Sequence, residues 1–166
     1  MSKSHKASAP TRAIEALEAA SVPYTVHEYV HSARARSFGE EAASQIGGDP
    51  TRMFKTLMVV CDGEEYVVGV VPVDHHLSLK AIARAAGHKN AEMADPHVAQ
   101  RRTGYVVGGI SPLGQTTAHR TFLDETALDH DTIMVSGGKR GLSVELSPLD
   151  LADITDADTA DLRAQD

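Results

Sequence analysis

Apolar residues gather in short runs along this chain, and several of these runs have the length and composition of β-strands. The clearest covers residues 53–61 and is followed, after Asp62-Gly63, by a second apolar run over residues 66–73. Because Asp-Gly favours a tight turn between two strands, this pattern predicts a β-hairpin. Five further short strands are expected at residues 24–30, 105–107, 120–123, 132–135 and 142–146.

Helices are predicted where a capping residue precedes apolar positions that share one helical face. Thr11 opens the first helix, which ends before Pro23, and residues 37–40 (Ser-Phe-Gly-Glu) have the spacing of a capping box for a helix that ends at Gly47. A short turn at Asp49-Pro50 and helices at residues 78–86, 96–102 and 148–154 complete the set. Strands and helices are interspersed without a regular βαβ alternation, which predicts an α+β domain with a mixed, curled sheet.

Two glycine-rich segments follow predicted strands. Residues 104–114 read Gly-Tyr-Val-Val-Gly-Gly-Ile-Ser-Pro-Leu-Gly, and residues 136–141 read Ser-Gly-Gly-Lys-Arg-Gly. Adjacent glycines let another group approach the backbone, and N–H groups at such a break can donate to a carbonyl or phosphate oxygen. We interpret the two segments as walls of one pocket that contains the charge of Lys55. The alternative is two structural bulges, with Lys55 on the solvent face of its strand.

The motifs of several enzyme classes are missing. Residues 109–114 have the two glycines of a P-loop, but Gln115-Thr116 stands where Lys-Ser/Thr is required. Neither His-Glu-x-x-His nor Cys-x-x-Cys occurs, so no metal site and no cofactor are expected. Cys61 ends an apolar strand without an evident base, and Ser111 has no hydrolase elbow around it and is suited to a turn with Pro112. The residues alone therefore indicate a polar pocket without a resident nucleophile.

Length and charge narrow the class of protein. The 166 residues suit one domain over residues 11–154, with a disordered lead-in at 1–10 and an acidic tail at 155–166 that is expected to fray. Residues 150–166 hold six aspartates and one arginine, so residues 1–149 keep a balance of only −2 out of the total −7. This charge argues against broad capture of nucleic acid such as DNA. The lack of a long apolar run or signal sequence and the single cysteine indicate a cytoplasmic protein without membrane contact.

Four ordered motifs resemble the YbaK/EbsC proteins, free-standing relatives of the editing domain inserted in bacterial prolyl-tRNA synthetase. They are Phe54-Lys55-Thr56-Leu57 and residues 91–96, 104–114 and 136–142. Because the match is nearly complete over residues 92–114, the chain is most similar to the deacylases of Cys-tRNA(Pro) and Cys-tRNA(Cys). The resemblance implies a barrel-like mixed sheet surrounded by helices. It also implies a reaction in which the thiol of the substrate attacks its own ester and displaces tRNA.

The resemblance also implies which residues form the site. Lys55 would hold a phosphate or ribose of the acceptor end, and the N–H groups of Gly108 and Gly109 would stabilise the oxyanion. The substrate pocket would be built from Tyr29, Phe38, Thr56, Ile110, Ser111, Ser136 and Gly137. The family has an Asp where this chain has Ser143. We hypothesise that Glu145, two residues further on the same strand face, partly replaces that carboxylate.

The implied partners are the acceptor end of an aminoacyl-tRNA and prolyl-tRNA synthetase, in a ternary complex in which the synthetase supplies tRNA identity. Two alternatives remain at this point. The chain could deacylate Ala-, Ser- or Thr-tRNA, a choice that depends on the size of the pocket. It could also be a non-catalytic module that binds a nucleotide or a tRNA end.

Overall fold

A computed structural model describes residues 10–29 and 49–165 of the chain. The helices are α1 (Arg12–Ala20), α3 (Leu79–Ala85), α4 (Pro96–Thr103) and α5 (Pro148–Thr155), with 3₁₀ turns η2 (Pro50–Arg52) and η3 (Glu125–Asp129). The strands are β1 (Thr25–Glu28), β2 (Phe54–Cys61), β3 (Glu65–Pro72), β4 (Ala91–Met93), β5 (Thr121–Asp124), β6 (Ile133–Lys139), β7 (Leu142–Leu146) and β8 (Asp158–Ala160). The helix predicted at residues 37–46 lies outside the described residues.

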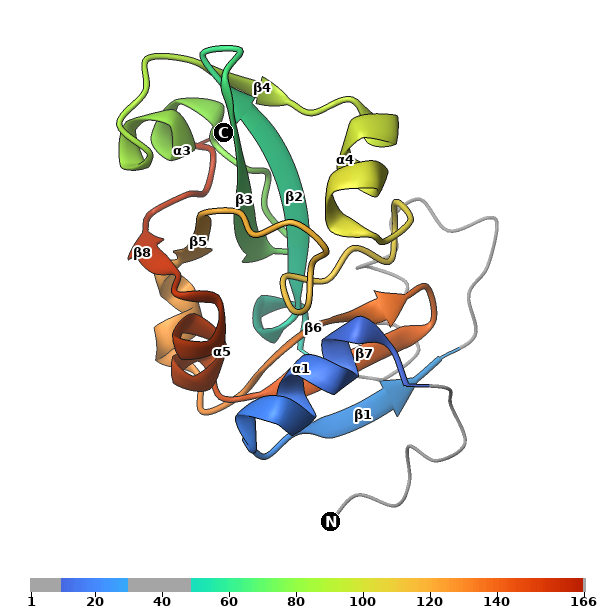
Figure 1. Cartoon of the computed structure of the whole chain (residues 1–166). Helices are drawn as coiled ribbons and strands as arrows, with labels where there is room; N and C mark the ends of the chain where they lie inside the picture. The colour runs from blue at the N-terminus through green and yellow to red at the C-terminus, as the bar shows by residue number, and fades with distance from the viewer. Residues whose placement is uncertain (1–9, 30–48, 166) are drawn as a thin grey trace.

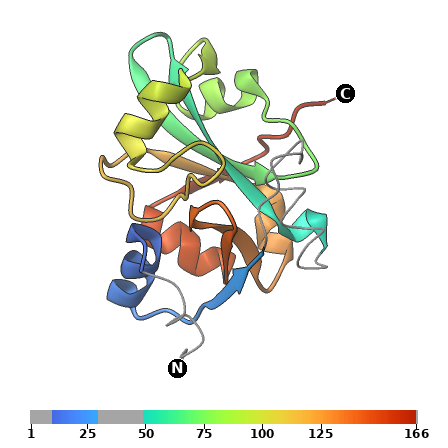
Figure 2. The same ribbon diagram turned by 90° about the vertical axis from the view of Figure 1, so that its right-hand side faces the viewer.

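The strands form two sheets. The larger has the order β4-β2-β3-β5-β8 and is mixed, since β3–β5 and β5–β8 are parallel pairs; the smaller is the antiparallel set β1-β7-β6. Figures 1 and 2 show the larger sheet with α3 and α4 at one end of the molecule, and the smaller sheet with α1 at the other. The predicted α+β class with a mixed sheet is confirmed. The two sheets meet at a bridge between Met53 and Met134 but do not close into a barrel, so the barrel-like expectation holds only as a loose description.

The predicted β-hairpin is confirmed and forms the centre of the larger sheet. β2 pairs with β3 from Phe54 opposite Pro72 to Cys61 opposite Glu65. Asp62 and Gly63 both have positive φ, of 51° and 68°, which is the backbone that a tight hairpin turn needs. β3 is buried over six consecutive residues because both of its faces are covered. Val68 and Val70 pack with α1 and the smaller sheet, whereas residues such as Val67 pack with α3 on the other side.

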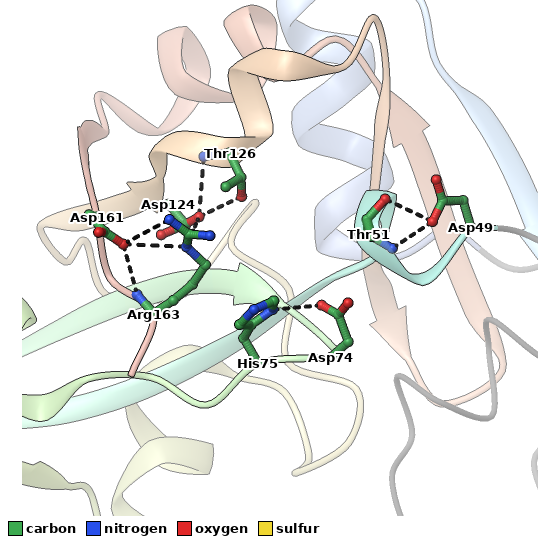
Figure 3. A network of polar contacts seen from close by, with 8 residues as sticks. All are labelled: Asp49, Thr51, Asp74, His75, Asp124, Thr126, Asp161 and Arg163. Carbon is green, nitrogen blue, oxygen red and sulfur yellow. Dashed lines mark hydrogen bonds and ion pairs between the residues drawn. The ribbon is translucent and has the colours of Figure 1, made fainter. Parts of the chain in front are cut away.

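The segment after Ile154 is part of the fold, so the prediction that it frays is wrong for residues 155–165. β8 pairs in parallel with β5, and the side chain of Leu162 is fully buried in the core beside α3. The backbone N–H of Leu162 donates to the buried carboxylate of Asp124 at 2.8 Å, and Arg163 Nε lies 3.5 Å from the same carboxylate (Figure 3). The acidic residues of this segment lie on its exposed side. Because they dominate the local sequence, the pattern does not show that a position such as Leu162 is buried.

The strand predicted at residues 105–107 is also wrong, because residues 104–120 form an irregular loop. Gly104 ends α4 with a φ of 83°, which turns the chain away from an extended path. Tyr105 is buried, and its hydroxyl donates to the carbonyl of Leu113 at 2.5 Å. Tyr105, a residue type that favours strands, therefore stabilises the loop through its contact with Leu113. The short strand β4 has no counterpart among the predicted elements.

None of the helices within the described ranges is long and apolar enough to cross a membrane.

A cluster of charges ties the β2–β3 turn to the end of α3. His88 Nδ1 lies 3.1 Å from Asp62 Oδ2 and His88 Nε2 lies 2.8 Å from Glu65 Oε1, while Arg120 donates two hydrogen bonds to Glu65. The hydrogen bond with Glu65 raises the pKa of His88 above its ordinary 6.5. The bonds from Arg120 and His88 lower the pKa of Glu65 to about 2.

The shifted pKa values predict how the stability conferred by this cluster depends on pH. A raised histidine pKa gives stability that is complete below about pH 6.5 and is lost as pH rises through the folded-state value. We therefore expect His88→Gln to lower the thermal unfolding temperature more at about pH 6 than at about pH 9. His75, in an exposed pair with Asp74 (Figure 3), provides the matched control, and His75→Gln should change the unfolding temperature little at either pH. An equal effect of His88→Gln at both pH values would contradict the expectation.

Candidate functional site

A cavity of about 350 Å³ lies between β2, β6, α4 and the loop at residues 104–120. Its wall is mainly apolar, with methionines contributed by β2, β4 and β6 and by the residue before β2. The polar side chains at the wall are those of Tyr29, Lys55, Thr56, Ser136 and Ser143. An apolar cavity with a few polar groups is typical of a small-molecule site.

β2 borders the cavity with the part of its edge that β4 leaves uncovered. Along β2, β4 pairs with Val59–Cys61. Next to this paired stretch, Ala94 N donates to the carbonyl of Met58 at 3.0 Å. Since backbone groups of a strand alternate between its two edges, the N–H and C=O of Thr56 point to the same edge as those of Met58. The backbone of Thr56 therefore faces the side on which the cavity lies.

Lys55 and Thr56 are the polar residues of β2 that line the cavity. Lys55 is partly buried there. The hydroxyl Oγ1 of Thr56 is buried and has no hydrogen-bond partner among the described residues. Buried hydroxyl groups are normally hydrogen-bonded, so this hydroxyl is an exception, and its burial separates it from the open part of the cavity.

The two glycine-rich segments contact each other beside this cavity, and each contributes to its lining, the first through Val107, Gly108 and Ile110 and the second through Ser136 alone. The Ser136 hydroxyl donates to the carbonyl of Gly109 at 3.0 Å and accepts from Gly138 N at 3.1 Å. Gly108 has a φ of 91°, and Gly109 N donates to the carbonyl of Val106 at 2.9 Å, so these residues form a type II β-turn. Only glycine adopts such a φ without strain.

The structure separates the site residues expected from the sequence into three groups. Six of them line the same cavity: Tyr29, Lys55, Thr56, Gly108, Ile110 and Ser136. Three do not line it: Gly109, Ser111 and Gly137. Gly109 packs on the backbone of Lys139 and Arg140, and Gly137 packs on Leu142. Ser111 is buried, and its Oγ accepts a hydrogen bond from Leu113 N. Phe38 lies outside the described residues.

Sequence reasoning did not point to the apolar part of the wall. Met53, Met58 and Met134 line the cavity although their positions are typical of ordinary core residues, and the half-exposed Met93 lines it as well. Two signals were present: Met134 stands two residues before Ser136 on β6 and hence on the same face of the strand, and Met93 lies within the motif at residues 91–96.

Ser143 lines the cavity, whereas Glu145 is not among the lining residues. The carboxylate of Glu145 lies 2.8 Å from His27 Nε2. It accepts hydrogen bonds from Arg52 Nη2 at 2.9 Å and from the Thr132 hydroxyl. These bonds, that of Thr132 first, lower the pKa of Glu145. The carboxylate thus joins β1, η2 and β7, and the hypothesis that it replaces the missing carboxylate finds no support in its position.

No group of three or more His, Cys, Asp or Glu residues that could hold a metal ion occurs in the described parts of the chain. The arrangement instead suits binding and orientation. Residues of the loop and of β6, among them Gly108 and Ser136, line the cavity together with Lys55 and Thr56 of β2. Such a site can stabilise developing negative charge on a bound ester.

Residues 33–154 match the aminoacyl-tRNA editing domain family. The chain is also 35% identical over 156 residues to EbsC of Enterococcus faecalis, a proposed Cys-tRNA(Pro)/Cys-tRNA(Cys) deacylase, with 94% of each protein covered. The chain belongs to the aminoacyl-tRNA editing domain family. The resemblance to YbaK/EbsC proteins is thereby confirmed.

Two further relatives place this editing domain in context. A solved structure described as a proposed trans-editing enzyme for prolyl-tRNA synthetase has a TM-score of 0.82 at 26% identity and covers 99% of both chains. The proline–tRNA ligase of Nitratidesulfovibrio vulgaris is 31% identical over 61% of this chain, but this match spans only 17% of the ligase. The editing domain thus occurs both as a free-standing chain and as a part of the synthetase.

Proposed function

We propose that the protein is a trans-editing deacylase that clears Cys-tRNA(Pro) and Cys-tRNA(Cys). The observation that carries this proposal is a cavity lined by Lys55, Thr56, Gly108 and Ser136, in a chain that matches EbsC over nearly its whole length. Among the described residues, the cavity wall carries no cysteine, and no histidine or carboxylate that could act as a base toward its hydroxyl groups or the Lys55 amine. The attacking group is therefore best supplied by the substrate.

The proposed reaction balances without any further reagent in its first step. The cysteinyl thiol loses its proton, and the sulfur attacks the carbonyl carbon of the same residue. The bond from that carbon to the ribose oxygen breaks, and the ribose oxygen takes up a proton, which gives free tRNA and a cyclic thioester. Water then opens the thioester to cysteine. Intramolecular attack held in a favourable geometry has an effective molarity of about 10⁵ M or more, so the protein can act by positioning.

Each polar group of the cavity has a role in this proposal. The Gly108 N–H stabilises the oxyanion formed on the carbonyl, and a donor of this kind contributes roughly 3 kcal/mol. Lys55 binds a phosphate or ribose oxygen of the tRNA end, and Thr56, its neighbour on β2, lines the same part of the cavity. The methionines provide a soft, apolar surface for the sulfur of the substrate.

Selection of the tRNA is proposed to depend on a partner. The net charge of −7 gives the protein little general attraction for nucleic acid. Prolyl-tRNA synthetase would supply tRNA identity in a ternary complex in the cytoplasm. This part of the proposal is supported by the relatedness to proline–tRNA ligases and to a proposed trans-editing enzyme for prolyl-tRNA synthetase.

Deacylation of labelled Cys-tRNA(Pro), Ala-tRNA(Pro) and Pro-tRNA(Pro) by the wild-type protein tests the proposed function. Release of cysteine is expected to be at least about 10²-fold faster than release of alanine or proline, because only cysteine carries an attacking group. Faster release of alanine would refute the cysteine specificity and leave an editing enzyme of another specificity. Tight binding without turnover of any ester would refute the enzymatic function in favour of a binding module.

A further inference from the structure

The turn Val106–Gly109 can present either of two peptide orientations to the cavity. In a β-turn the central peptide, here the carbonyl of Val107 and the N–H of Gly108, points in opposite directions in types I and II. A glycine in the third position makes both types accessible. The φ of 91° at Gly108 shows that this turn is in the type II orientation.

The Val107 carbonyl is held by a side chain from the other glycine-rich segment. Arg140, between β6 and β7, donates from Nε at 2.9 Å and from Nη2 at 2.7 Å to this one oxygen. The preceding peptide is fixed as well, since Val107 N donates to Gln100 Oε1 at 3.0 Å. The central peptide of the turn is therefore restrained by α4 on one side and by Arg140 on the other.

Peptide planarity links this restraint to the cavity. In a trans peptide the C=O and N–H point in opposite directions, so the bonds from Arg140 set the direction of the Gly108 N–H. Val107 and Gly108 both line the cavity, whereas Arg140, toward which the Val107 carbonyl points, does not; the N–H, which points away from Arg140, is therefore on the cavity side of the peptide. Donation to the carbonyl also polarises the peptide and makes its N–H a stronger donor.

We propose that Arg140 is a positioning residue that selects the type II turn and so directs the Gly108 N–H into the cavity. This inference rests on the proposed deacylase function, in which that N–H stabilises the oxyanion. Without Arg140 the peptide is free to flip, and the flipped state presents the carbonyl oxygen of Val107 to the developing negative charge. Arg140 does not touch the substrate in this proposal.

Arg12 offers a matched control. Its Nε donates at 2.9 Å to the carbonyl of Gly114, in the same loop but beyond the turn. Arg12→Ala therefore removes one guanidinium and one loop contact while leaving the Val107–Gly108 peptide restrained. Arg140→Lys keeps the charge of Arg140 and one potential donor but lacks the two-donor geometry.

The test is single-turnover deacylation of Cys-tRNA(Pro) over a range of enzyme concentrations. Arg140→Ala is expected to lower the rate at saturating enzyme by about 10- to 100-fold, with half-saturation changed by less than about threefold. Arg140→Lys should recover part of this rate, and Arg12→Ala should stay within about threefold of the wild type. A loss confined to half-saturation and removed by lower salt would mean that Arg140 only attracts tRNA, and would overturn the proposal.

A second measurement separates this proposal from the function on which it rests. In amide NMR spectra, Arg140→Ala and, less strongly, Arg140→Lys should shift the Gly108 signal and speed its hydrogen exchange, whereas Arg12→Ala should not. An unchanged Gly108 amide in Arg140→Lys and Arg140→Ala overturns the positioning role even if deacylation occurs. A wild-type protein without turnover refutes the deacylase, while the amide signals still decide whether Arg140 controls the turn.

Discussion

Replacing Lys55 by alanine is expected to slow deacylation of Cys-tRNA(Pro) by about 100-fold or more. The ammonium group is the cation that β2 places at the cavity wall, and a hydrogen bond to a charged group contributes up to about 3 kcal/mol, equivalent to roughly two orders of magnitude. The expected loss is in the rate at saturating enzyme if Lys55 binds the tRNA end more tightly in the transition state than in the ground state. Single-turnover kinetics with wild type and Lys55→Ala measures it.

The fold should survive this substitution. Lys55 is only partly buried, and its backbone pairs with Val71 whatever its side chain. A change of this kind usually alters stability by about 1 kcal/mol or less, which thermal unfolding would show. Lys80→Ala on the exposed side of α3 is the matched control and should leave the rate unchanged. A Lys55→Ala protein with a near-normal rate would remove Lys55 from the site.

Exchanging the substrate thiol for a hydroxyl is expected to have an effect at least as large. Ser-tRNA(Pro) has the size and charge of Cys-tRNA(Pro), but at pH 7 a few per cent of a thiol is ionised and almost none of an alcohol. If the thiol attacks, the wild-type protein should deacylate Ser-tRNA(Pro) about 10²- to 10³-fold more slowly.

The pH dependence provides a second criterion for the same mechanism. The rate with Cys-tRNA(Pro) should rise with pH up to the pKa of the substrate thiol, because the thiolate is the nucleophile. Rates measured on both esters at matched pH, corrected for spontaneous hydrolysis, decide the question. Comparable enzymatic rates for cysteine and serine would indicate attack by water instead.

Local features of the chain were predictable because their causes lie within a few residues. The β2–β3 hairpin follows from Asp62-Gly63 between two apolar runs, and the positive φ of both residues shows why this dipeptide works there. Caps at Thr11, Ser78 and Asp95 likewise start helices where the sequence places them, since each side chain accepts a hydrogen bond from the first turn.

Features that depend on distant partners were not predictable in the same way. Leu162 stands among acidic residues, and only its packing beside α3 and the pairing of β8 with β5 show that it is buried. Tyr105 has the residue type of a strand, but its partner is the carbonyl of Leu113 across a loop. Local pattern cannot reveal such contacts, because they arise only when the chain has folded.

The candidate site shows the same division. The glycines of residues 104–114 and 136–141 pointed to a pocket because their backbone freedom is a local property. The position of Lys55 did not follow from its strand, since periodicity alone allows either face. It became clear only from the uncovered edge of β2 beside β6 and the loop. The binding of Val107 by Arg140 depends on two segments 33 positions apart, and neither segment signals it alone.

The pairing of β1 with β7 affects how the protein folds during its synthesis on the ribosome. His27 and Glu145 meet across 118 positions of the chain, so β1 has no sheet to join until β7 has left the exit tunnel. Contacts of such long range also slow folding, because a large loop must close before they form. The larger sheet likewise lacks β8 until residues 158–160 have emerged. Nascent chains interrupted before that point would expose apolar surface and unpaired strand edges of both sheets, and we expect them to be prone to aggregation.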